Sequence, residues 1–167
     1  MLDELILAAT SSRPLERQRR AHRARVSVVY AYTPNTMRLQ SILRHVQPIP
    51  GFVYGHVELV NRGVAAQLQV HVRPRQSCRA VCSGCGKKRP GYDTLGERRF
   101  SFVPLWGMMV ILLYTMRRVN CRRCGVTVEL VPWASGSSPQ THALAWFLAS
   151  WAKTLSWKET ARRFGTS

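Results

Sequence analysis

Apolar residues first recur with a structural period close to residue 37. Four apolar side chains then share one helical face: Leu39, Ile42, Leu43 and Val46. This spacing predicts a short helix over residues 37–46. The prolines at positions 48 and 50 terminate it. Residues 1–36 lack such a period and carry a run of arginines: Arg13, Arg17, Arg19, Arg20, Arg23 and Arg25. We interpret them as a solvated basic tail, or as an extension upstream of a start at Met37; an arm that contacts phosphates is the alternative.

Two β-rich runs follow the predicted helix. They cover Phe52–Val60 and Ala65–Val72, and the turn residues Asn61-Arg62-Gly63 separate them. In the second run Leu68, Val70 and Val72 alternate with polar residues, as in a half-buried strand. Residues 37–75 are therefore predicted to form a helix followed by a β-hairpin.

The longest apolar stretch, residues 100–116, allows two interpretations. It is nearly free of charge and reaches the lower length limit for a transmembrane helix. However, Pro104 and Gly107 interrupt it. Arginines also flank it on both sides, so the flanking charges do not indicate which end of a membrane helix would face the cytoplasm. A turn at Pro104–Gly107 between two buried strands fits the pattern better, and we expect no membrane partner.

The C-terminal segment, residues 138–167, is predicted to be helical. Ser138 and Pro139 fit an N-cap and a first helical residue. An apolar stripe follows, made of Leu144, Phe147, Leu148, Trp151 and Leu155. Ser156 and Glu159 then fit a capping box, and Gly165 can end the second helix. The pattern fits the start of a helix-turn-helix and fits a generic capped surface helix equally well.

The charge balance narrows the class of partner. The 167 residues include 25 Lys+Arg and 8 Asp+Glu, which gives a formal charge of +17. Because 46% of the residues are hydrophobic, the chain can fold and is not a disordered polycation. Such a charge favours a polyanion, most simply nucleic acid, as partner. Carboxylates are too few to favour a two-metal nuclease site, so we expect neither a catalytic residue nor a small-molecule substrate.

Four of the five cysteines form two C-x-x-C-G motifs. Two intervening residues let both thiolates of a pair face one ion, and the following glycine relieves the backbone as it turns. The long spacer between the pairs accommodates the two predicted strands, which is typical of a zinc ribbon with an extended hairpin. We predict one structural zinc ion within residues 76–131, bound by Cys82, Cys85, Cys121 and Cys124. Iron at the same ligands and a redox dithiol are alternatives, and Cys78 is a spare thiol or a substitute ligand.

Basic residues surround both cysteine motifs and recur near the C-terminus. Those predicted to contact DNA phosphates are Lys87, Lys88, Arg89, Arg122, Arg123, Lys158, Arg162 and Arg163. A solvated surface charge is the alternative interpretation for each of them.

Several motifs, taken in order from about Leu39 to Ser167, resemble the N-terminal region of bacterial insertion-sequence transposases of the ISL-three family. These motifs are VCSGCG, GYD, ERRFSFVPLWG, RRVNCRRCG, VELVPWA, AWFLASWAK and LSWKETARRFGTS. The resemblance implies a zinc-binding module, then a helix-turn-helix beginning at Trp157–Ser167, then an Asp-Asp-Glu catalytic domain. It also implies that the four paired cysteines are the zinc ligands. By this resemblance, we expect the chain to end before the recognition helix and the catalytic carboxylates, as in a truncated reading frame.

The sequence therefore predicts an α+β fold, with a small antiparallel β zinc-ribbon module followed by helices that begin a helix-turn-helix. The expected function is binding of insertion-sequence ends by a transposase fragment that is not an enzyme by itself. Cysteine usage and this function place it in the bacterial cytoplasm, at the nucleoid. Two alternatives stay open: a module that pairs with and regulates an intact transposase, and an RNA-binding zinc ribbon.

Overall fold

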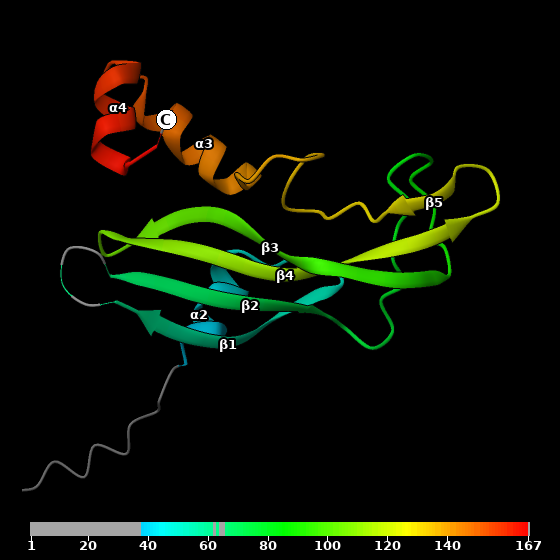
Figure 1. Ribbon diagram of the computed structural model, residues 1–167. Coiled ribbons are helices and arrows are strands. Elements are labelled where there is room, and N and C mark those ends of the chain that lie inside the picture. The colour runs from blue at the N-terminus through cyan, green and yellow to red at the C-terminus, as the bar shows by residue number, and fades with distance from the viewer. Residues whose placement is uncertain (1–37, 62, 64–65, 167) are drawn as a thin grey trace, which may run out of the picture. The chain divides into compact units, whose positions relative to one another are not determined.

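The computed structural model describes residues 38–61, 63 and 66–166. The predicted basic tail, residues 1–36, lies outside the described residues. A five-stranded sheet organises the described part (Figure 1). Its strands are β1 Phe52–Val60, β2 Gln67–Pro74, β3 Gly91–Leu105, β4 Met108–Cys121 and β5 Gly125–Val128. The order is β1-β2-β4-β3, with β5 paired to β4 at the end of the sheet where the cysteines lie.

All strand pairs are antiparallel except β2 and β4, which run parallel from Gln67↔Met109 to His71↔Leu113. This pairing joins the β1–β2 hairpin to the long β3–β4 hairpin. The strands before and within the cysteine-bearing segment therefore share one sheet.

The apolar stretch over residues 100–116 forms strands, as predicted. Trp106 and Gly107 make the turn between β3 and β4, with φ angles of 50° and 78°. Positive φ at both central residues is the signature of a type I′ hairpin turn. Phe100 and Leu112 on either side of it are fully buried. No helix among the described residues is long and apolar enough to cross a membrane.

The main core lies on one face of the sheet, under helix α2 (Leu39–Val46) and the loop that follows β5. Trp133 in that loop packs edge-on against three core rings: Phe52 at 4.8 Å, Tyr114 at 5.2 Å and Phe100 at 5.8 Å between centroids. Helix α2 confirms the predicted element and buries Leu43, whereas Val46 at its end stays exposed.

The start of the next helix was predicted wrongly. Helix α3 spans His142–Trp151 and its N-cap is Thr141, whose hydroxyl accepts a hydrogen bond from the Leu144 amide at 3.2 Å. The chain before it is extended, because Gln140 bridges Ser101 at the β3 edge. Ser138 accepts a hydrogen bond from the Gln140 amide instead of capping a helix, and Pro139 is not helical.

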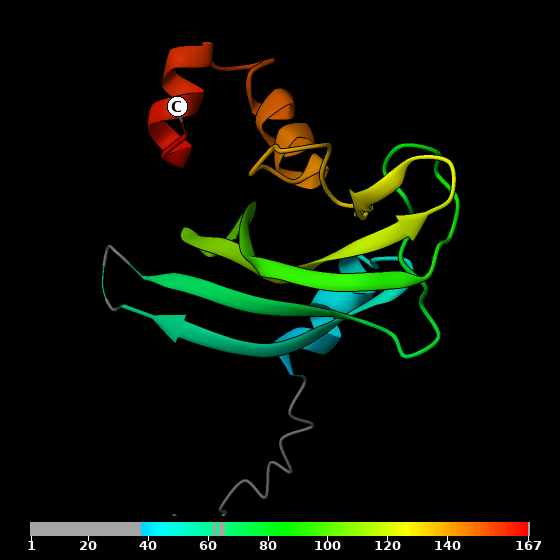
Figure 2. The ribbon, with the colours of Figure 1, turned by 45° about the vertical axis from the view of Figure 1, so that its right-hand side comes forward.

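Helix α4, Trp157–Phe164, confirms the predicted capping box. Ser156 and Glu159 cap each other's backbone amides, and Gly165 ends the helix in the left-handed region at φ 62°. Phe164 packs against two rings of α3, with centroids 4.9 Å from Phe147 and 5.7 Å from Trp151. Helix α3 lies against β3, the edge strand of the sheet, and α4 packs on α3 (Figure 2).

Candidate metal centre

Two tight turns present the cysteine pairs. The first is a small hairpin in which Val81 bridges Lys88, and the Gly86 amide donates to the Cys82 carbonyl at 2.9 Å. The second is the turn between β4 and β5, where Cys121 pairs with Gly125. The glycines after the second cysteines, Gly86 and Gly125, have φ angles of 66° and 74°. This left-handed conformation strains any other residue, so the C-x-x-C-G pattern has a backbone cause in both turns.

Backbone pairing brings the two turns together. Cys82 bridges Glu129, the residue after β5, and the Leu130 amide donates to the Val81 carbonyl at 2.7 Å. As a result, the Sγ atoms of four cysteines lie within 4.8 Å of one another: Cys82, Cys85, Cys121 and Cys124. These are the four predicted ligands.

The geometry of this cluster fits zinc. Zn–S bonds of about 2.3 Å in a tetrahedron place neighbouring sulfurs about 3.8 Å apart. The Sγ atoms of Cys85 and Cys121 are 3.7 Å apart. Cys82 and Cys121 are 0% and 1% exposed, so the inner half of the site is closed to water. Four thiolates leave no open coordination position, which makes this a structural zinc site.

Gly84, in the first cysteine turn, lies close to Cys124 in the second. A Cβ atom at this position would lie 3.0 Å from Cys124 Sγ and 3.3 Å from Cys124 Cβ. The absence of a side chain therefore lets the first turn approach the second turn closely enough for shared coordination.

The thiols differ in their readiness to ionise. Hydrogen bonds from the Thr127 hydroxyl and the Cys85 amide lower the pKa of Cys82. The Cys124 amide lowers the pKa of Cys121 to about 6. Burial, together with the neighbouring thiols, raises the pKa of Cys124 to about 12. Each turn thus holds one thiol with a lowered pKa, and a bound divalent cation would draw the proton from the others.

Arg89 lies beside this site. Interaction with the thiols of Cys85 and then Cys121 raises the pKa of the guanidinium. Four thiolates around a divalent ion carry a charge of about −2, which an adjacent guanidinium partly offsets. Arg89, named from the sequence as a DNA contact, is therefore also positioned to stabilise the metal site.

The other basic residues named from the sequence are exposed and fall into two groups. Those on the two cysteine turns are Lys87, Lys88, Arg122 and Arg123, and those on α4 are Lys158, Arg162 and Arg163.

A buried ion pair between Glu129 and Arg117 links the metal site to the sheet. The sequence did not predict it. Glu129 is 3% exposed and accepts hydrogen bonds from Tyr114 Oη at 2.5 Å and from Arg117 Nη2 at 2.6 Å. Burial, reinforced by Glu129, raises the pKa of Tyr114. Arg117 Nη1 also donates to the Cys78 carbonyl at 3.1 Å, just before the first turn. The only signal in the sequence is one carboxylate within the apolar run Val128–Val131.

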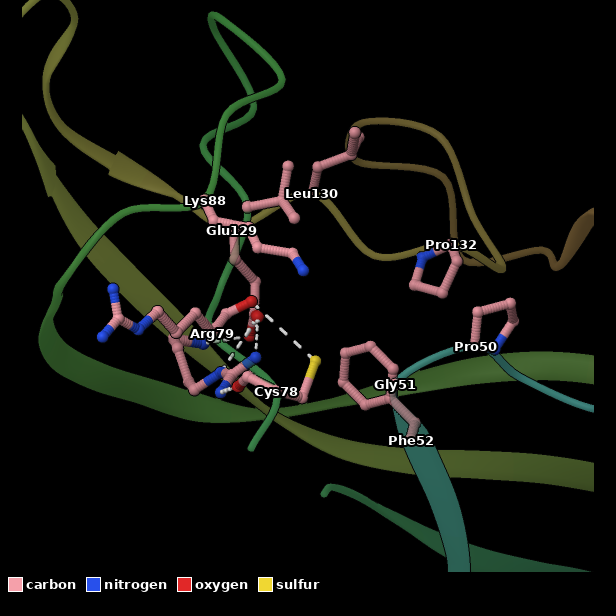
Figure 3. A pocket seen from close by; sticks show the side chains of 11 residues that line it. Pro50, Gly51, Phe52, Cys78, Arg79, Lys88, Glu129, Leu130 and Pro132 are labelled. Atoms are coloured by element: carbon pink, nitrogen blue, oxygen red, sulfur yellow. Dashed lines mark hydrogen bonds and ion pairs between the residues drawn. The ribbon is translucent and has the colours of Figure 1, made fainter. Parts of the chain in front are cut away.

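Cys78 does not join the four-thiol cluster. Its sulfur lies against the backbone of Gly51, where a Cβ atom would be 2.6 Å away. It lines a cavity of about 300 Å³ together with Phe52, Glu129 and Pro132 (Figure 3).

Comparison with known proteins agrees with this geometry. Residues 78–124 match the family model described as the zinc-finger of transposase IS204/IS1001/IS1096/IS1165. The chain is also 35% identical over 98 residues to the "Transposase for insertion sequence element IS1557" of Mycobacterium tuberculosis, in strains CDC 1551 / Oshkosh and ATCC 25618 / H37Rv. The match covers 55% of this chain but only 22% of each relative. No solved structure matches the chain significantly. The predicted resemblance to the zinc-binding region of an insertion-sequence transposase is confirmed.

Proposed function

We propose that this chain is a DNA-binding zinc-ribbon module of the transposase type, which recognises the phosphate backbone and does not cut DNA. One observation carries the proposal: both cysteine turns display exposed cations around a shared structural metal site. Lys87 and Lys88 come from the first turn, and Arg122 and Arg123 come from the second. The name of the relatives, transposase for an insertion sequence element, makes the ends of such an element the natural DNA target. This role would place the protein at the bacterial nucleoid.

In this proposal the metal acts through structure. Zinc would hold the two turns in register, so that four cations are fixed with respect to one another before DNA arrives. Contacts to phosphates position a protein on DNA without reading its sequence. The module is therefore expected to supply affinity and orientation rather than preference for one end sequence.

Filter binding at two salt concentrations, with an element-end duplex and a scrambled duplex, tests this proposal. We expect a steep loss of affinity with salt and little difference between the duplexes. Removing one phosphate contact, as in Arg122→Ala, should reduce the log–log salt slope by about 1. Arg44→Ala, which removes an exposed cation from α2, is the matched control and should leave the slope unchanged. Strong preference for the element end would refute backbone-only recognition, and absence of DNA binding would refute the function.

We further propose that α4 begins a helix-turn-helix that extends the DNA-binding surface. The support is a capped helix with basic residues in its last turn, Arg162 and Arg163, and a left-handed glycine at its end. Arg163→Ala should weaken duplex binding as Arg122→Ala does; no effect on affinity or salt slope would remove α4 from the interface.

A second candidate function is pairing with an intact transposase, and the surface of the two C-terminal helices favours it. Trp146 on α3 and Trp157 on α4 are 73% and 71% exposed. Exposed aromatic residues are enriched at protein interfaces. Pull-down of the full-length enzyme after nuclease treatment, compared with a Trp146→Ala variant, tests this candidate. Loss of capture on nuclease treatment would show that DNA bridges the two proteins.

A further inference from the structure

An open hollow lies next to the metal site, and it adds Tyr92 and Asn120 to two of the predicted DNA contacts, Arg89 and Arg122. Its volume is about 520 Å³, and the residues that line it include Arg89, Tyr92, Asn120 and Arg122. Its lining residues belong to the start of β3, the end of β4 and the loops beside them. These strand ends lie at the end of the sheet that carries β5 (Figure 1). The hollow therefore combines an aromatic ring, an amide and two guanidinium groups.

The aromatic ring in this hollow is exposed and held in place. Tyr92 is 58% exposed, yet the guanidinium of Arg118 lies over one face of its ring, 5.4 Å from the centroid. Asp93 fixes that guanidinium in turn, because Arg118 Nε donates to Asp93 Oδ1 at 2.6 Å and Nη2 donates to Oδ2. Support on one face reduces the freedom of the ring before any ligand binds. Such preorganisation strengthens binding by lowering its entropic cost.

The chemistry of the wall matches one kind of ligand. An aromatic ring with a free face stacks on an unpaired nucleobase, whereas the bases of a duplex are already stacked on each other. Asn120 offers an amide donor and acceptor for the edge of a base. Arg122, exposed in the second cysteine turn, supplies a cation for the adjoining phosphate.

We propose that this hollow binds a nucleotide of single-stranded DNA, with the base stacked on Tyr92 and its phosphate held by Arg122. The inference rests on the proposed DNA-binding function and adds a preference to it: unpaired strands are bound through stacking, duplexes through charge alone. Breathing or frayed DNA ends are the chemical class of target that offers such bases.

Fluorescence anisotropy with the zinc-loaded full chain tests the proposal. The probes are a single-stranded oligothymidine of about ten nucleotides, a duplex of equal length and a single-stranded RNA. Tyr92→Ala should weaken single-strand binding by about fivefold to a hundredfold and leave duplex binding nearly unchanged. Tyr92→Phe keeps the stacking face and should bind as wild type. Trp106→Ala, which removes an exposed ring from the opposite end of the β3–β4 hairpin, is the control.

The outcomes separate the two proposals. If Tyr92→Ala binds the single strand like wild type while duplex binding persists, the hollow is not a nucleotide site and the DNA-binding function stands. If the wild-type chain binds neither form of DNA, both proposals fail. Tighter, Tyr92-dependent binding of RNA would overturn the assignment to DNA, because contact with the 2′-hydroxyl distinguishes the two. Zinc content and circular dichroism of each variant show that altered binding does not reflect loss of fold.

Discussion

At the scale of single residues, the metal site depends on four sulfurs, two of which lie entirely inside the protein. Cys82→Ser replaces a buried thiolate with a poor zinc ligand, so we expect zinc content to fall from about one ion per chain to near zero. Metal analysis after dialysis measures this. Cys78→Ser is the matched control, because Cys78 lies outside the cluster, and it should retain the metal. Normal zinc content in Cys82→Ser would show that the four-cysteine assignment is wrong.

A smaller change tests the spacing between the two turns. Gly84→Ala adds a Cβ atom 3.0 Å from Cys124 Sγ, so one turn must shift away from the other. We expect a zinc affinity lower by about tenfold, at the lower end of the range for altered support around metal ligands. Competition with a chromogenic chelator gives the affinity. Gly96→Ala, where the new atom meets nothing within 4 Å, provides the control. Equal zinc affinities for Gly84→Ala and Gly96→Ala would mean that the two turns accommodate the added Cβ atom without moving apart.

The C-x-x-C-G motif predicts some residues of the metal site but not all of them. The C-x-x-C-G pattern identified four ligands and two left-handed glycines, because both follow from local backbone geometry. The position of Arg89 beside Cys85 and Cys121 does not follow from spacing, since pairing of the two turns creates it. An arginine near a cysteine motif is consistent with a phosphate contact and with a metal-site neighbour, and only the fold distinguishes them.

At the scale of elements, the Glu129–Arg117 pair joins the segment after β5 to β4. Glu129→Gln removes the charge that receives three hydrogen bonds from Arg117 and leaves that guanidinium partly buried without its counterion. We expect a loss of about 3–5 kcal/mol in the free energy of unfolding. Denaturant unfolding at neutral pH measures it.

The surface pair Asp93–Arg118 supplies the comparison for that experiment. Both side chains are more than a third exposed and solvent screens their charges, so Asp93→Asn should lower the free energy of unfolding far less than Glu129→Gln does. Losses of the same size in the two variants would show that burial does not govern the strength of these ion pairs.

Element boundaries followed from the sequence where local chemistry sets them. The capping box at Ser156 and the turn before β4 are local devices, and both were predicted. The start of α3 was not, because the bridge between Gln140 and Ser101 keeps residues 139–141 extended and moves the cap to Thr141. A long-range contact with the β3 edge thus overrides a Ser-Pro pair that favours a helix start.

At the scale of the whole molecule, the described residues contain two cores of unequal size. The larger core lies between the sheet, α2 and the Trp133 loop, and is built from apolar side chains. The smaller one contains Ala80, Cys82, Val119 and Cys121, with the remaining two ligands packed against it. Sequence reasoning placed strands around the cysteines but did not find the parallel β2–β4 pairing, since no local pattern specifies which strands become neighbours.

This division predicts how the molecule responds to loss of zinc. Apart from its cysteines, the small core contains only two buried apolar side chains, Ala80 and Val119, which are too small to stabilise it without the ion. The large core, by contrast, contains a cluster of aromatic rings around Trp133. Chelation should therefore open the two cysteine turns, residues 80–90 and 120–130, and leave β1, β2 and the centre of β4 folded. Hydrogen exchange with and without a chelator resolves these segments. Because the cations of the turns would lose their fixed arrangement, duplex affinity should fall in parallel, and zinc should restore it. Uniform loss of protection across the sheet would show that the ion stabilises a single cooperative unit.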